Sequence, residues 1–170
     1  EGPRCCYLGG AACNKRITEN ASWIDRFDYK HSEMKTTFDT DSILYNILLN
    51  SPLKNAISGG FYLGEDRPDD SEEEDVVINS IVLSQDYHPQ IGTSNVNIYA
   101  PDKKVRIKGK EQMASARSRL KILSEKAIRI LKEAKIQGLA FTIESQTILP
   151  EPSVRQHFVN IRISWNIQTD

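Results

Sequence analysis

The chain has 170 residues, and its 22 Lys and Arg residues nearly balance its 23 Asp and Glu residues, which gives a formal net charge of −1. This balance excludes a uniformly basic, histone-like nucleic-acid binder and an acidic solubilising tail as descriptions of the whole chain. Hydrophobic residues make up 39% of the sequence, enough for a core, but no apolar run approaches the roughly 20 residues of a membrane-spanning helix.

Residues 1–33 differ from the rest of the chain in showing no sustained periodicity, and they hold all three cysteines, Cys5, Cys6 and Cys13. No histidine or further cysteine lies near enough in the sequence to complete a tetrahedral zinc site, so we expect no structural metal there. We interpret 1–33 as an N-terminal extension, peripheral or not native to a protein that starts at Met34. The alternative is an ordinary arm that packs on a neighbour. Residues 34–170 then form a single domain.

The first predicted element of the domain is a helix. Asp39 or Thr40 can cap it, and apolar residues recur at helical spacing from Ile43 to Leu48. Pro52 interrupts the pattern and Gly59-Gly60 ends it. A short strand or loop anchor is expected at 61–63.

An acidic segment follows, with eight carboxylates between Glu65 and Asp75 and a single arginine, Arg67. So many like charges resist packing, and we expect a solvated, mobile loop. The β-branched run 76–84 then predicts a strand. Tyr87, His88, Pro89 and Gly92 indicate a turn, and the alternating residues 95–100 predict a second strand with one buried face.

Residues 103–110 are predicted to be a basic connector. Beyond it, apolar residues follow one another at intervals of three and four, which predicts a long helix over about 111–135, ended by Gly138. The stripe consists of Met113, Ala116, Leu120, Leu123, Ala127, Ile130 and Ala134.

Two strands close the chain, one at Phe141 and Ile143 and one over 159–168. In the last strand every second residue from Val159 to Ile167 is apolar and the residues between are polar. This alternation is typical of an antiparallel sheet covered on one face. The predicted fold is therefore α+β, an antiparallel sheet with two helices packed on one face in two layers.

The sequence contains none of the phosphate-loop, dinucleotide-binding, nucleophile-elbow or zinc-protease motifs. His88 and His157 are conceivable general bases of a small hydrolase, but no nucleophile motif accompanies them. The acidic segment lacks the spacing of a calcium loop. We therefore expect no enzyme, no cofactor and no metal.

The opposite charges of two segments suggest one further possibility, self-association. Between Lys103 and Lys135 the sequence has twelve Lys and Arg and three Glu, and no aromatic residue that would stack on bases. Three interpretations stay open: a solvated helix face, a nucleic-acid surface, and self-association in which the acidic segment of one copy meets the basic segment of the next. The candidate interface residues are Glu65, Asp66, Asp69, Asp70, Glu72, Glu73, Glu74, Lys104, Arg106, Lys108, Lys110, Arg117 and Lys121.

The layout resembles the tail-completion, or tail-terminator, proteins of long-tailed bacteriophages and prophages. The likeness rests on the helix that leads into 51–62, the strands near 76–81 and 95–100, the long helix, and the closing segment 157–165. It covers 34–170. The long acidic segment and the basic connector depart from the pattern expected of that family.

The resemblance implies a structural role in the virion. It implies a homo-hexameric ring that caps the tail tube and offers a surface for head attachment, with the tube and head–tail connector proteins as partners. DNA would pass through without specific binding, and the protein would occur in the host bacterial cytoplasm during assembly and then in the virion tail. The alternatives are another head–tail connector component, a nucleic-acid-binding module using Arg106, Lys108, Lys110, Arg117 and Lys121, and the hydrolase considered above.

Overall fold

A computed structural model describes residues 34–168, so the predictions for 1–33 and its cysteines lie outside the described residues. In chain order the elements are α1 (Thr37–Leu49), β1 (Phe61–Leu63), β2 (Val76–Leu83), β3 (Gln90–Pro101), β4 (Lys103–Ile107), β5 (Lys110–Ala114), α2 (Arg117–Glu133), β6 (Leu139–Glu151) and β7 (Gln156–Ile167). A 3-10 turn, Pro152–Val154, connects the last two strands.

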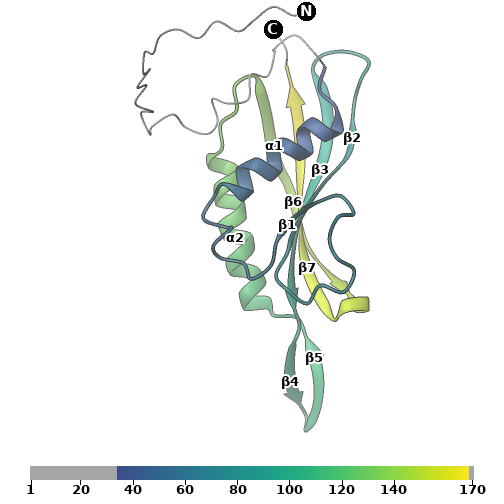
Figure 1. Cartoon of the computed structure of the whole chain (residues 1–170), viewed down its shortest axis with the longest axis vertical. Helices are drawn as coiled ribbons and strands as arrows, with labels where there is room; N and C mark the ends of the chain where they lie inside the picture. The colour runs from purple at the N-terminus through teal and green to yellow at the C-terminus, as the bar shows by residue number, and fades with distance from the viewer. Residues whose placement is uncertain (1–33, 169–170) are drawn as a thin grey trace, which may run out of the picture.

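The main sheet has the strand order β1-β2-β3-β7-β6 (Figure 1). All neighbouring pairs are antiparallel except β1 and β2, which run parallel over three residues. The predicted α+β class with an antiparallel sheet is confirmed, with one short parallel strand added at its edge.

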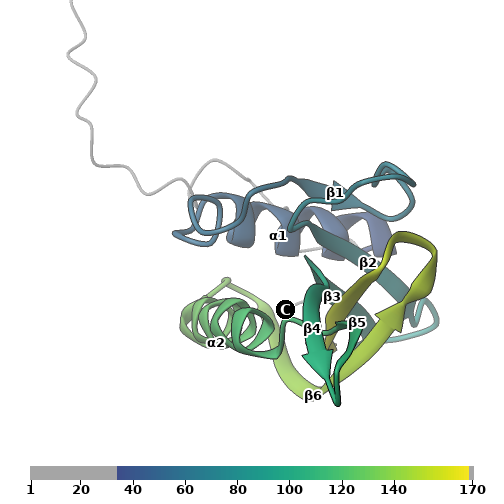
Figure 2. The ribbon, with the colours of Figure 1, turned by 90° about the horizontal axis from the view of Figure 1, so that it is seen from below.

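Both helices cover the same face of this sheet, as Figure 2 shows end on. The sheet face under them consists of alternate residues of the central strands, such as Val96 and Ile98 of β3 and Ile161 and Ile163 of β7, all fully buried. These side chains form one apolar cluster with the buried stripes of α1 and α2. The predicted two-layer core is confirmed. The strict alternation of apolar and polar residues in β7 is the clearest sequence signal for it.

A line of polar side chains fixes α1 on the sheet. The indole nitrogen of Trp165 donates to Ser94 Oγ over 2.7 Å, and Ser94 Oγ lies 2.6 Å from Ser80 Oγ. Ser80 Oγ lies in turn 2.7 Å from the hydroxyl of Thr40 in α1, which donates to the carbonyl of Thr37. The buried polar groups of three strands and one helix thus satisfy one another.

Two details of the predicted helices were wrong. Thr36 caps α1 instead of Asp39 or Thr40. The backbone nitrogen of Thr36 donates to the Asp39 carboxylate over 2.7 Å, which forms a capping box. The long helix begins at Arg117 and not near residue 111, because 103–114 folds as a hairpin instead of a connector and a helical turn. Neither helix of the described residues has the length and apolar character needed to cross a membrane.

Candidate assembly interface

The β4–β5 hairpin projects from one end of the molecule, beyond the layer of helices and the main sheet (Figure 1). Its two strands pair only with each other, from Lys103 with Ala114 to Ile107 with Lys110. Lys108 and Gly109 form its turn, with φ of 49° and 82°. Two successive positive φ values are characteristic of the type I′ turn, whose twist matches that of the flanking strands.

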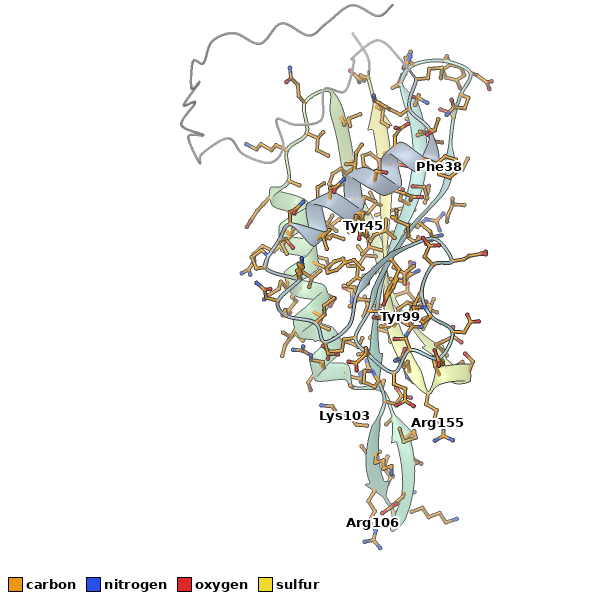
Figure 3. The ribbon with its side chains drawn as sticks, in the orientation of Figure 1. Phe38, Tyr45, Tyr99, Lys103, Arg106 and Arg155 are labelled. Carbon is orange, nitrogen blue, oxygen red and sulfur yellow. The ribbon has the colours of Figure 1, made fainter. Side chains whose placement is uncertain are left out.

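The side chains of the hairpin are basic and exposed. Lys103, Lys104, Arg106, Lys108 and Lys110 are all exposed, against one exposed carboxylate, Glu111. Figure 3 shows Arg106 beside the tip, pointing away from the body.

Apolar side chains accompany these charges. Ile107 is 49% exposed and Met113 is 40% exposed, and strand alternation places them on opposite faces of the ribbon. A two-stranded ribbon that packs on no large element of its own fold buries little by itself. The hairpin therefore presents both charge and apolar area to the outside.

The root of the hairpin is fixed to the β6–β7 connection. Asp102 lies between β3 and β4; its carboxylate is 2.6 Å from Nδ1 of His157, and its backbone nitrogen donates to the carbonyl of Arg155 over 3.1 Å. Arg155 is exposed and lies near the root on the same end as Lys103 (Figure 3). Arg155 thus adds a cation to the basic end of the molecule that the sequence had not indicated.

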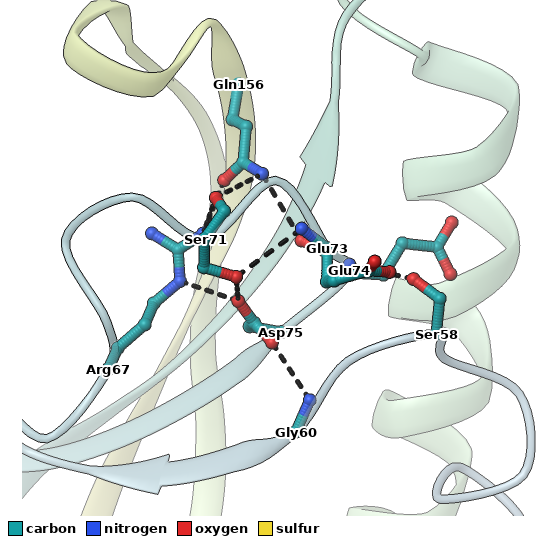
Figure 4. A network of polar contacts seen from close by, with 8 residues as sticks. All are labelled: Ser58, Gly60, Arg67, Ser71, Glu73, Glu74, Asp75 and Gln156. Carbon is teal, nitrogen blue, oxygen red and sulfur yellow. Dashed lines mark hydrogen bonds and ion pairs between the residues drawn. The ribbon is translucent and has the colours of Figure 1, made fainter.

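The acidic segment divides into a fixed part and an exposed part. Asp75, fully buried, accepts hydrogen bonds from Arg67 Nε over 2.9 Å, from Gly60 N over 2.9 Å and from the Ser71 hydroxyl. Arg67 also donates to Gln156 of β7 (Figure 4). Three hydrogen-bond donors offset the hydration that a carboxylate loses when it is buried.

Arg67 places this segment on the sheet face that points away from the helices. Its guanidinium lies 4.0 Å from the ring centroid of Tyr99, and Tyr99 stacks on Phe158 with centroids 4.8 Å apart. Burial raises the pKa of the Tyr99 phenol, although the Arg67 charge opposes the shift. The phenol is therefore neutral at physiological pH, and the ring serves as a packing surface.

Glu74 is the second fixed carboxylate of the segment. Arg119 of α2 donates to its two oxygens over 2.6 and 2.7 Å, and the Arg119 pKa is raised chiefly by this hydrogen bonding. The expectation of a wholly solvated loop was therefore wrong for Glu74 and Asp75. The remaining carboxylates are exposed; we call them the acidic rim: Glu65, Asp66, Asp69, Asp70, Glu72 and Glu73.

The other two candidate residues, Arg117 and Lys121, lie on the first turns of α2, away from the hairpin tip. Both are exposed and line an open groove between α2 and β6, together with Gln146. Lys121 is 3.7 Å from Glu125, one turn further on. These two cations belong to a different surface from the hairpin, so the predicted basic segment is divided between two surfaces.

The two histidines that could have served a hydrolase lie at opposite ends of the sheet. His157 faces Ala100 near the end of β3, whereas His88 immediately precedes Pro89 and the start of β3. The described residues contain no group of three or more His, Cys, Asp or Glu side chains that could hold a metal ion.

Sequence reasoning missed the hairpin and the ion pairs that fix the acidic segment. A weak signal for the hairpin was present, because Lys108-Gly109 follows the short alternating stretch 104–107, and a glycine there favours a tight turn. No local signal identifies the partners of Arg67 and Arg119, which are set by contacts across the fold.

Comparison with known proteins gives no match: no family model matches the sequence, and no curated protein is similar enough to count as a relative.

Proposed function

We propose that this protein is a structural subunit that assembles head to tail with copies of itself into a ring. We propose further that this ring caps a phage tail tube and offers a surface for head attachment, as tail terminators do. The observation that carries the proposal is the hairpin: a basic, partly apolar ribbon that leaves the body and finds no partner within the described fold. The tail-terminator part of the proposal rests, in addition, on the resemblance of the sequence layout to that family.

The partner surface that we propose for the hairpin is the acidic rim of the next copy. Six exposed carboxylates stand against five exposed cations of the hairpin, so the two surfaces are complementary in charge. Because they are different patches of one subunit, their contact is heterologous, and such contacts close into rings when the rotation between subunits permits. Ile107 or Met113, which lie on opposite faces of the ribbon, would supply apolar area on whichever face meets the rim, which charge alone does not provide.

The fixed part of the acidic segment supports the same proposal. Arg67 and Arg119 neutralise Asp75 and Glu74 and hold the ends of the segment on the body. The rim is thereby presented from a fixed base, which lowers the entropy lost on binding.

The experiment is a charge reversal in the full-length protein, read by light scattering and negative-stain microscopy. The unmodified protein is expected to form a six-fold annulus, and the variant Lys104→Glu/Arg106→Glu/Lys108→Glu is expected to be a monomer. The control, Lys126→Glu/Arg129→Glu/Lys132→Glu, changes the net charge equally on α2 and leaves the ring intact. Combining the hairpin reversal with Asp70→Lys/Glu72→Lys/Glu73→Lys is expected to restore assembly. An unmodified protein that stays monomeric at high concentration contradicts the proposal.

A second candidate function, nucleic-acid binding, is favoured by the shape of the hairpin. A two-stranded ribbon fits the major groove of B-form DNA, and five cations would contact phosphates. This candidate predicts DNA binding by a monomer, with an affinity that falls steeply with salt and is lost in the hairpin reversal. If the unmodified protein forms a ring and binds DNA no more tightly than the hairpin-reversed variant, nucleic-acid binding by the hairpin is excluded.

A further inference from the structure

A groove runs between α2 and β6, which is an edge strand of the main sheet (Figure 2). Its volume of about 470 Å³ falls within the range of roughly 300 to 1,000 Å³ that is typical of ligand sites. The side chains that line it come from α2, β6 and β7, so neither the hairpin nor the acidic rim takes part. The groove is therefore separate from the proposed ring contact, and the inference drawn from it does not depend on that ring.

The groove exists because α2 leaves part of β6 uncovered. Gln146 pairs with Ile161 and Ile148 pairs with Val159, and cross-strand partners share a face of the sheet. Since Ile161 and Val159 are fully buried in the core, Gln146 lies on the face that the helices cover. Gln146 is nevertheless exposed, and within the described part of the chain its amide makes no hydrogen bond. This wall thus offers an occupant one free amide beside the half-buried Ile148.

The α2 wall carries an ordered row of charges. Arg117, Lys121 and Glu125 follow one another at intervals of four residues, so they lie on one side of the helix with a rise of about 6 Å between neighbours. Among the described residues the Arg117 side chain has no partner, and Lys121 lies 3.7 Å from Glu125 with both side chains mostly exposed. An exposed pair of this kind contributes little to stability. The row positive, positive, negative is therefore available to a partner.

The spacing of this row matches an extended peptide. Alternate residues of an extended chain point to the same side and lie about 6 to 7 Å apart, close to the rise between the charged residues of α2. Carboxylates at two alternate positions would therefore meet Arg117 and Lys121, and a cation two residues further on would meet Glu125. The guanidinium of Arg117 can bind a carboxylate through two parallel hydrogen bonds. The Gln146 amide has both a donor and an acceptor for a peptide backbone.

The open form of the groove favours a peptide over a small molecule or a nucleic acid. Small-molecule sites bury roughly 70 to 90% of their ligand, whereas Arg117, Lys121, Glu125 and Gln146 are all exposed to solvent. An occupant would therefore stay in contact with water along its length. Glu125 would repel a phosphate backbone, which carries negative charge only. A peptide can supply charges of both signs in the required order.

We propose that the groove between α2 and β6 binds an extended peptide segment of a partner protein, in which two carboxylates at alternate positions are followed two residues later by a cation. Arg117 and Lys121 bind the carboxylates, and Glu125 pairs with the cation. Gln146 and Ile148 contact the opposite side of the segment. The groove then selects its partner by the order of charges and not by net charge alone.

Isothermal titration calorimetry of the full-length protein with two capped pentapeptides tests this selection. The peptide Glu-Ser-Glu-Ser-Lys has the proposed order, and Glu-Ser-Lys-Ser-Glu has the same composition and net charge with its cation in the middle. We expect the first to bind about fivefold more tightly, because the second places its cation beside Lys121. Equal affinities, or no binding of either peptide up to about 1 mM, overturn the proposal.

A charge swap tests whether the peptide occupies this groove. The variant Arg117→Glu/Lys121→Glu/Glu125→Lys reverses the row and is expected to prefer Lys-Ser-Lys-Ser-Glu over Glu-Ser-Glu-Ser-Lys. The control Arg129→Glu, on the same helix, changes the net charge by the same amount and keeps the original preference, and circular dichroism verifies that both variants are folded. The hairpin reversal Lys104→Glu/Arg106→Glu/Lys108→Glu also keeps it. Loss of binding in the hairpin reversal would assign the peptide to the hairpin and overturn the proposal.

Two further outcomes would contradict a separate protein partner. If the swapped variant loses an assembled mass that the unmodified protein shows in light scattering, the occupant is a second copy of this chain. If a single-stranded DNA oligonucleotide binds more tightly than the peptide and loses its affinity in the swapped variant, the groove is a nucleic-acid site. We expect neither result.

Discussion

The ionised carboxylate of Asp41 destabilises the folded state at neutral pH. One of its carboxylate oxygens is buried without a hydrogen-bond partner, and burial raises the pKa of this group although contacts with Ser80 oppose the shift. A raised pKa means that the folded state binds the proton more tightly than the unfolded state. The contribution of Asp41 to stability therefore falls as the pH rises above its ordinary value of 3.8.

We predict that Asp41→Asn increases the free energy of unfolding at pH 7, and that the gain disappears below about pH 3, where the carboxyl is protonated in both states. Urea denaturation at a series of pH values measures this. The matched control is Asp39→Asn on the same helix, which weakens the capping box and is expected to cost about 1 kcal/mol at pH 7. A gain from Asp41→Asn that persists at low pH would assign the effect to something other than its charge.

A second residue-scale prediction concerns Ser94, the centre of the polar line under α1. Ser94→Ala removes the acceptor of the buried Trp165 indole and the neighbour of Ser80. We expect a loss of about 1 to 3 kcal/mol in the free energy of unfolding, because a buried donor is left unsatisfied. Ser164→Ala, on the other sheet face, is expected to change stability by at most about 0.5 kcal/mol. Equal effects of the two substitutions would show that the polar line contributes nothing specific.

At the scale of elements, the hairpin is a locally stabilised unit. Gly109 has a φ of 82°, in the region that side chains rarely adopt, and the hairpin packs on no large element of the body. We predict that Gly109→Ala destabilises the hairpin by about 1 kcal/mol but leaves global unfolding unchanged. Faster exchange of the β4 and β5 amides, with an unaltered urea midpoint, is the expected readout. A matched shift of the midpoint would mean that the hairpin belongs to the core.

The hairpin also marks where element prediction failed. The stretch 111–116 contains Met113 and Ala116 in phase with the helix that follows, so helical periodicity extended the predicted helix too far. In the structure Met113 is exposed on β5, and the periodic stripe begins to pack only at Ala116. Periodicity reports which residues share a face of a helix, but a tight turn nearby decides whether that helix has begun.

At the scale of the whole molecule, opposite charges sit on separate surfaces although the net charge is only −1. The proposed ring joins these surfaces, and exposed ion pairs are screened by salt. We predict that raising the salt concentration from about 0.1 to 1 M, which shortens the Debye length from about 10 to 3 Å, lowers the assembled mass. Light scattering measures the mass, and circular dichroism verifies that the subunit stays folded. A mass that salt does not change would indicate an interface held by apolar contact instead of charge.

The α+β class, the covered face of the sheet and the core of the central strands could all be predicted from local sequence patterns. These follow from alternation in 159–167 and 95–100 and from the helical stripe around Leu120 and Leu123, which are local patterns fixed by the geometry of each element. It also identified the acidic and basic segments that form the candidate interface.

The distribution of those charges over the surface depends on the folded arrangement of the whole chain. Arg67 and Arg119 lie 8 and 45 residues from their carboxylate partners, and no periodicity links a charge to a partner that folding brings beside it. The same holds for the edges of the sheet: a strand is recognised from its own residues, whereas an edge is defined by the neighbours that the rest of the chain does or does not supply.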